Sequence, residues 1–159
     1  MQSLVESVYP HLAVLRRFAR GHAVSMEAAD GLLLLALDKL VKRRFFVDKT
    51  AIKLEMLRII HDLSNEAFNS GEPDKPTSQV QGQTDIAWHF SKLAPFDRSL
   101  LLLTSIEELS HEKTAWILRT SESQILPRLV QSRERLREIL ESRSHGRILS
   151  GGGHLRRVK

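Results

Sequence analysis

The fold is decided by residues 93–140, which read LAPFDRSLLLLTSIEELSHEKTAWILRTSESQILPRLVQSRERLREIL. Apolar residues recur there with the 3.6-residue period of amphipathic helices, and no alternation typical of a strand occurs. Pro95 suits the first turn of one helix, and Ser110 is a good N-cap for the next. After a short turn at Arg119-Thr120, a last helix is predicted from about Ser121 to Glu141.

The last two of these helices have the spacing of a helix-turn-helix, whose second helix can enter the major groove of DNA. An ordinary helical hairpin has the same spacing. The second helix carries Arg128, Arg133, Arg135 and Arg137. Pro127 lies about six residues into it and removes a backbone hydrogen bond, so we expect the helix to be distorted or to restart there. Either outcome would compromise a base-reading surface.

The N-terminal half predicts three further helices, over about residues 9–20, 26–44 and 50–68. Ser25 and either Asp48 or Thr50 are the expected caps of the second and third. The second contains five leucines among the six residues 32–37 and is apolar nearly all round. Such a helix lies at the centre of a bundle or is partly covered by a partner.

The sequence therefore predicts an all-α fold of two small helical lobes. Residues 1–69 form a three-helix lobe, and residues 84–141 form the helix-turn-helix lobe, which begins with a short helix at Thr84 or Asp85. Between them, residues 70–83 are rich in Pro, Gly and polar side chains and are expected to be a flexible linker. Residues 142–159 lack periodicity and are expected to be a disordered basic tail.

Charge argues against a nucleic-acid-binding body, although the chain has a formal net charge of +5. Five basic residues and no acidic one lie in residues 142–159. Removing these 5 from the 24 Lys and Arg leaves 19, which balance the 19 Asp and Glu of residues 1–141. The folded part is thus neutral, and only the tail is basic.

No pattern in the sequence predicts catalysis, a cofactor or a metal. There is no cysteine, no phosphate-binding glycine motif and no GxSxG motif, and the seven histidines form no HExxH or similar ligand pair. The longest apolar run, residues 32–37, is far below the ~20 residues of a membrane helix. We also find no secretory signal at the N-terminus, and we expect a cytoplasmic protein that is not an enzyme.

Residues 93–140 resemble the C-terminal, promoter-reading domain of extracytoplasmic-function sigma factors. The matching positions are Leu93-Ala94, Arg98, Leu101–Leu103, Ser110, Ala115, Ile117-Leu118, Arg133, Arg135, Leu136 and Arg137. In the first half, PHLAVLRRFARG at residues 10–21 and LEMLRIIHDLSNEAF at residues 54–68 look like the N-terminal sigma domain. This resemblance implies a sigma-2-like lobe followed by a sigma-4-like lobe.

Three departures from working sigma factors change the functional expectation. Residues 29–35 read ADGLLLL where the family has an acidic polymerase-docking stretch. The third helix ends with Asp62 and Glu66, which would repel phosphates, and Pro127 interrupts the recognition helix. This pattern resembles the sigma-factor-like domain of the PhyR response regulators. That resemblance implies a sigma-factor mimic (an anti-anti-sigma protein), which binds an anti-sigma factor of the NepR type in the general stress response.

Exposed leucines on both lobes would then receive the amphipathic helices of the anti-sigma factor. The candidates are Leu33, Leu34, Leu37 and Leu40 in the first lobe and Leu126, Leu129 and Val130 in the second. For each of them, ordinary core packing is the simpler alternative. The alternative function is a divergent extracytoplasmic-function sigma factor that binds RNA polymerase core and promoter DNA through Arg128, Arg133, Arg135 and Arg137.

Overall fold

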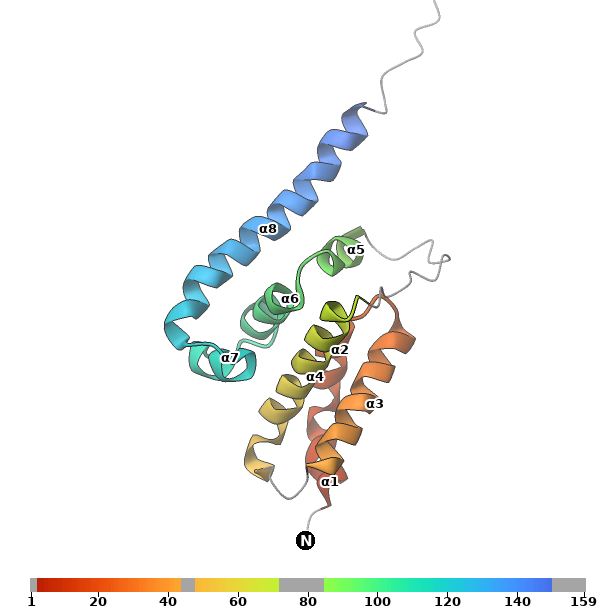
Figure 1. The fold of residues 1–159 in the computed structure, drawn as a ribbon, viewed down its shortest axis with the longest axis vertical. Coiled ribbons are helices and arrows are strands. Elements are labelled where there is room, and N and C mark those ends of the chain that lie inside the picture. The colour runs from red at the N-terminus through yellow and green to blue at the C-terminus, as the bar shows by residue number, and fades with distance from the viewer. Residues whose placement is uncertain (1–2, 44–47, 72–84, 150–159) are drawn as a thin grey trace, which may run out of the picture.

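The computed structural model describes residues 3–43, 48–71 and 85–149, and these residues fold into helices (Figure 1). The first lobe contains α1 (Leu4–Val8), α2 (Leu12–Arg20), α3 (Met26–Lys42) and α4 (Ile52–Asn69). The second contains α5 (Asp85–Ser91), α6 (Pro95–Leu101), α7 (His111–Leu118) and α8 (Glu122–Leu149). The all-α, two-lobed fold predicted from the sequence is confirmed.

In the first lobe α2, α3 and α4 pack side by side and bury one face each. Phe18, Leu40 and Ile60 are among the fully buried side chains at their centre. The hydroxyl of Ser25 accepts a hydrogen bond from the Ala28 amide, as expected of an N-cap. The leucine-rich α3 is not central to the bundle: Leu34 is 66% exposed and Leu35 is 58% exposed. Its outer face is therefore open to a partner.

In the second lobe α6 and α7 pack against α8 around Leu100, Ile117 and Ile125, which are all fully buried. Ser110 caps α7, as predicted, by accepting a hydrogen bond from the Lys113 amide. A π-helical turn, Leu102–Ile106, links α6 to the loop before α7. Arg119 ends α7 in the left-handed conformation, with φ of 54°, and this sets the turn that leads into α8.

The structure of α8 differs from the prediction in two respects. The helix runs through Pro127 without restarting, because buried Ile125 and Leu129 anchor it on both sides of the proline. It also continues to Leu149, beyond the end expected near Glu141. Of the predicted linker, residues 70–83, only Ser70 and Gly71 are described, and residues 150–159 of the predicted tail also lie outside the described part.

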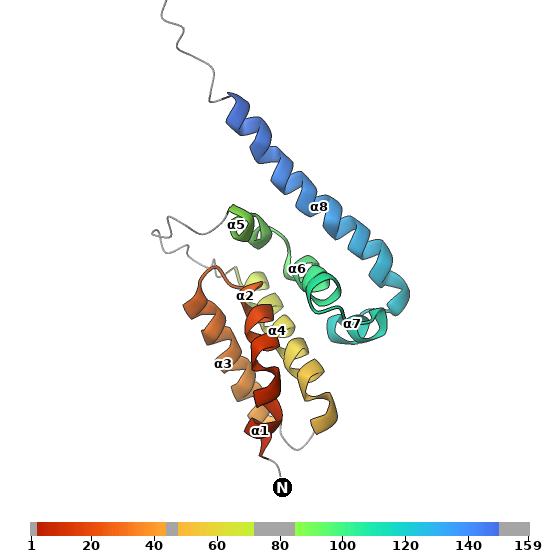
Figure 2. The ribbon, with the colours of Figure 1, turned by 180° about the vertical axis from the view of Figure 1, so that it is seen from behind.

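The two lobes are packed against each other along α4, which contacts both α6 and α7. Both views of the ribbon place α3 and α8 on opposite sides of this central layer (Figures 1 and 2). Gly21, at the end of α2, allows a close approach: a Cβ atom there would lie 2.3 Å from the Leu102 side chain. The lobe interface is thus built from residues far apart in the sequence.

Candidate partner-binding site

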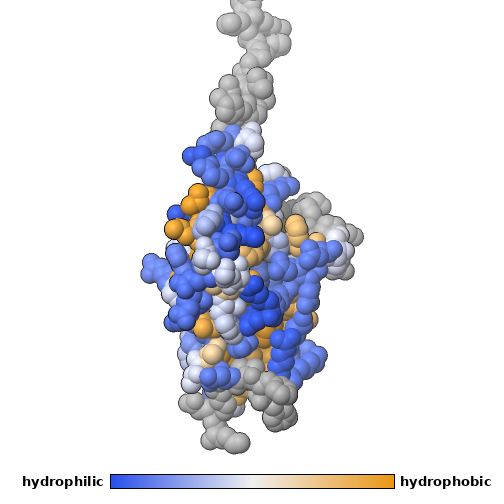
Figure 3. All heavy atoms as spheres, turned by 60° about the vertical axis from the view of Figure 1, so that its left-hand side comes forward, coloured by the Kyte–Doolittle hydropathy of each residue, from blue (hydrophilic) through white to orange (hydrophobic). Residues whose placement is uncertain are grey.

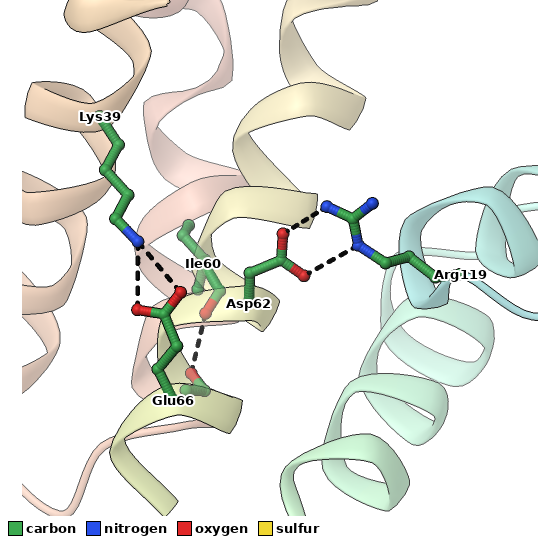
Figure 4. Close-up of polar contacts among 6 residues, drawn as sticks. Lys39, Ile60, Asp62, Glu66 and Arg119 are labelled. Carbon is green, nitrogen blue, oxygen red and sulfur yellow. Dashed lines mark hydrogen bonds and ion pairs between the residues drawn. The ribbon is translucent and has the colours of Figure 1, made fainter. Parts of the chain in front are cut away.

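Two ion pairs join the lobes at the protein surface. Arg119 of the helix-turn-helix reaches Asp62 on α4, with Nη2 2.8 Å from Oδ2 (Figure 4). Arg17 on α2 donates two hydrogen bonds, of 2.7 and 2.8 Å, to Glu107, whose side chain is 4% exposed. Each carboxylate raises the pKa of its arginine, by hydrogen bonding and by charge, so both arginines stay positively charged.

The acidic end of α4 has a role that the sequence did not predict. Asp62 and Glu66 were expected to repel phosphates, but each is paired within the protein (Figure 4). Asp62 binds Arg119 of the other lobe, and Glu66 binds Lys39 on α3. The carboxylates of this segment therefore hold neighbouring helices together, and any repulsion of DNA phosphates comes in addition to that role.

Beneath these ion pairs, a chain of buried hydrogen bonds crosses from one lobe to the other. Ser99 on α6 lies 2.7 Å from Nδ1 of His61 on α4 and 2.9 Å from Nε2 of His22, just after α2. Asn65 Nδ2 lies 2.9 Å from His61 Nε2. Arg98 adds a fourth link, since its Nη1 donates to the backbone oxygen of His22 at 3.2 Å. We call His22, His61, Asn65 and Ser99 the histidine relay.

The protons of the relay can be assigned from its chemistry. An amide nitrogen only donates, so Asn65 donates to His61 Nε2, and His61 Nδ1 must carry the proton that it donates to Ser99. The Ser99 hydroxyl then donates to His22 Nε2. His22 Nδ1 is left as an N–H group, and it is buried without a hydrogen-bond partner.

Both histidines are held neutral. Burial lowers the pKa of His61 from 6.5 to about 4, and the nearby Arg119 charge acts in the same direction while Asp62 opposes it. Burial also lowers the pKa of His22 well below 6.5, and the charge of Arg98 adds to that shift. A proton on either ring would place a charge inside the lobe interface.

The seven leucine and valine candidates fall into two groups. Leu33, Leu40 and Leu129 are buried in the core, so these three support the surface but do not form it. Leu34, Leu126 and Val130 are 66%, 58% and 54% exposed, and Leu37 is partly buried. Because α3 and α8 lie on opposite sides of the molecule, no single short helix can cover both exposed groups (Figures 1 and 2).

The four arginines considered for DNA binding are mostly engaged within the protein. Arg128 lies over the Phe96 ring, with its guanidinium carbon 5.0 Å from the ring centroid. Arg135 binds the buried carboxylate of Asp97 at 2.7 Å, which also accepts from Ser132. Arg137 pairs with Glu134 and Glu141 on its own helix, and Arg133 is exposed.

Up to Glu141, the part of α8 whose side chains the structure describes carries as many acidic as basic residues. Between Glu122 and Glu141 the helix has four arginines and four glutamates. Hydrophilic residues dominate this side of the molecule, and apolar residues show in separate patches among them (Figure 3). Phosphate binding depends on the number of cations that are not already neutralised, so this face is poorly suited to grip a promoter.

Two features are absent from the residues that the structure describes. No helix among them is long and apolar enough to cross a membrane. The described side chains also contain no cluster of three or more His, Asp or Glu residues that could hold a metal ion.

These features define a sigma-factor-like domain: two helical lobes, the second with a helix-turn-helix, packed around α4. No model of a known protein family matches the chain. Its sequence is similar to the phyllosphere-induced regulator PhyR of Methylorubrum extorquens, with 27% identity over 124 residues. That match covers 77% of the chain and 45% of the relative, so the chain spans less than half of that regulator's length.

Two solved structures share the fold. The PhyRSL–NepR complex of Sphingomonas sp. Fr1 matches with a TM-score of 0.68 and 24% identity, over 86% of this chain and 88% of that one. The sigma factor RpoE of Bartonella quintana, solved in complex with the anti-sigma factor NepR, matches with a TM-score of 0.64 and 18% identity, over 86% and 95%. These likenesses confirm the predicted fold of two helical lobes, and the sequence is similar to a regulator of the PhyR type.

Proposed function

We propose that this chain is a sigma-factor mimic that binds an anti-sigma factor of the NepR type in the general stress response, acting as an anti-anti-sigma protein without catalytic activity. The observation that carries the proposal is the state of the α8 arginines, three of which bind partners within the protein. The fold of a sigma factor is thus kept, while the cations needed for DNA binding are engaged.

The sequence similarity to a PhyR protein and the fold shared with structures solved in NepR complexes support the same function. A true sigma factor also has this fold, so the fold by itself does not separate the mimic from the alternative, a promoter-binding sigma factor. The pairing of the α8 arginines within the protein favours the mimic over the promoter-binding sigma factor. Because the proposed partner is an anti-sigma factor that controls transcription, we place the protein in the cytoplasm, where that factor and its sigma factor would act.

Exposed Leu34 on α3 and exposed Leu126 and Val130 on α8 are the proposed contacts of the anti-sigma factor. They lie on two sides of the molecule, so the proposed partner contacts both lobes through two separate segments (Figure 2). Amphipathic helices laid on apolar residues are a common recognition mode of this kind.

The test mixes the purified chain with the NepR-type anti-sigma factor encoded in the same genome. Size-exclusion chromatography with light scattering should give a one-to-one complex, and the chain should release the sigma factor from that anti-sigma factor. With polymerase core and a stress promoter, the chain itself should support no transcription. Formation of an open complex at the promoter would refute the mimic and favour the sigma-factor alternative.

A further inference from the structure

The outer face of α3 is exposed from its first turn to its last and is apolar at its centre. Both ribbon views place α3 at the outer edge of the first lobe (Figures 1 and 2). Leu34, Leu35 and Val41 are 66%, 58% and 48% exposed there. Helical spacing puts seven exposed residues on this one face, and we call them the α3 strip: Glu27, Gly31, Leu34, Leu35, Asp38, Val41 and Lys42.

The charges of the α3 strip are arranged so that it is complementary to itself. Glu27 lies in the first turn of α3, Lys42 lies in the last turn, and Leu34 and Leu35 lie midway between them. Two antiparallel copies of α3 can meet with Leu34 of one copy opposite Leu35 of the other. Glu27 of each copy then lies opposite Lys42 of the other, at both ends of the contact. A parallel pair would instead bring like charges together, and its helix dipoles would also repel.

Both charged ends of the strip are accessible. Within the described part of the chain Glu27 forms no ion pair, and Lys42, which binds Asp38 on its own helix, keeps 72% of its side chain exposed. Lys42 can therefore meet a second carboxylate without leaving the first. Opposite charges at the two ends of an antiparallel contact fix its register as well as its direction.

Gly31 is the member of the strip that the fold of a single chain does not explain. It lies inside α3, where glycine lowers the stability of a helix relative to alanine. A Cβ atom at Gly31 would meet nothing within 4 Å, so packing within the chain does not require glycine there. In the antiparallel pair Gly31 lies opposite Asp38 of the second copy, about one turn from the two-fold axis. A missing side chain at that point lets the two helix backbones approach closely.

We propose that the α3 strip joins two copies of this chain, with their α3 helices antiparallel and Leu34 of each copy packed on Leu35 of the other. Glu27 and Lys42 would form an ion pair at each end. Such a contact is closed by a two-fold axis, so it stops at a dimer. One helix per copy covers less than the standard interface of about 800 Å² per partner, so the dimer is weak and depends on concentration. This inference goes beyond the proposed function and does not depend on it.

Self-association would regulate access to α3. Leu34 is also a proposed contact of the anti-sigma factor, so a second copy of the chain and an anti-sigma factor would exclude each other there. This consequence, unlike the dimer, rests on the proposed function. Light scattering of the complex with the anti-sigma factor should give the mass of one chain and one partner. A mass of two chains and two partners would overturn the exclusion while leaving the proposed function in place.

Sedimentation velocity of the full chain, from about 10 μM to about 1 mM, tests the dimer over the range expected of a weak interface. The average mass should rise from that of the monomer towards twice that value. Leu35→Asp places a carboxylate beside the two-fold axis and should weaken the dimer roughly tenfold or more. Leu126→Asp is the matched control, because Leu126 is also 58% exposed but lies on α8, on the opposite side of the molecule. It should associate as the wild type does.

Charge exchange tests the register. Glu27→Lys or Lys42→Glu makes both ends of the dimer repulsive, because the two-fold axis repeats each change, and either should weaken association about tenfold. A mixture of the two variants restores opposite charges at both ends and should associate about as strongly as the wild type. Circular dichroism checks that each variant is folded, since both changes also oppose the dipole of α3.

Gly31→Ala gives a readout with two opposite signs. At low concentration it should make the monomer more resistant to urea, because alanine is the better helix former. At high concentration it should weaken the dimer about threefold or more, because the added methyl group separates the backbones. A merely local role of Gly31 would change the first quantity and leave the second as it is.

Three results would overturn the dimer: a wild-type chain that stays monomeric up to about 1 mM, equal weakening by Leu35→Asp and Leu126→Asp, or charge variants that fail to associate when mixed. Gly31→Ala that associates as tightly as the wild type would do the same for the close approach of the two helices. None of these measurements uses the anti-sigma factor, so their failure is distinct from a failure of the proposed function.

Discussion

Lowering the pH from 7.5 to 5 is expected to destabilise the packed lobes through the histidine relay. The folded-state pKa of His61 is about 4, whereas an unfolded histidine has a pKa of about 6.5. Stability from a lowered histidine pKa is fully present above the unfolded value. It falls as the pH drops below 6.5, because the unfolded chain takes up a proton that the folded chain excludes.

The magnitude follows from the two pKa values. At pH 5 His61 is almost fully protonated in the unfolded chain and mostly neutral in the folded one, which removes about 2 kcal/mol from the free energy of unfolding. The pKa of His22 is also lowered, so its contribution has the same sign. A loss of this size is a large fraction of the stability of a small domain.

Urea unfolding followed by circular dichroism at pH 7.5 and pH 5 measures the effect. His61→Gln should lower the stability at pH 7.5, because Ser99 and Asn65 lose their partner, but it should flatten the pH dependence by about 2 kcal/mol. His111→Gln, at an exposed position, is the control and should keep the wild-type slope. Equal losses in the wild type and His61→Gln between the two pH values would refute the reasoning.

Three further predictions concern stability, each measured by chemical denaturation. Asp97→Ala should lower the free energy of unfolding by about 2 kcal/mol, since buried Ser132 loses its acceptor. The same Asp97→Ala change made in a Ser132→Ala background should cost less, and equal losses in the two backgrounds would contradict this reasoning. Gly21→Ala should cost about 1 kcal/mol by crowding Leu102, and Leu102→Ala should suppress that cost, whereas additive losses would exclude the contact. Ser25→Ala should cost about 1 kcal/mol through its lost N-cap, and no loss would show that the cap is not formed.

Local features of the fold were predictable because they depend on short spacings. Ser25, Pro95 and Ser110 begin helices at the positions expected from capping chemistry. The expected alternative that the helix restarts at Pro127 was wrong, because that expectation considered the helix alone. Only one backbone hydrogen bond is lost, and the packing of Ile125 and Leu129 against the second lobe holds the helix across the proline.

The lobe interface was not predictable from periodicity. His22 and Ser99 are 77 residues apart in the sequence, and no local pattern predicts that they are in contact. One signal did exist: His61 lies between Ile60 and Asp62 on a helix whose apolar side includes Leu57 and Ile60, and a histidine there calls for a buried partner. The partner itself comes from the other lobe, which only the three-dimensional structure identifies.

The two ion pairs that join the lobes, Arg17–Glu107 and Arg119–Asp62, also help to decide whether the protein acts as a mimic or as a sigma factor. Arg17 and Arg119 would be free cations on separated lobes, but Glu107 and Asp62 neutralise them where the lobes pack. Packing therefore removes positive charge from the surface just as it fixes the relative position of the lobes. A protein that needed those cations for phosphates would have to open its lobes and break both pairs, whereas a protein that presents a fixed surface to another protein gains from keeping them closed.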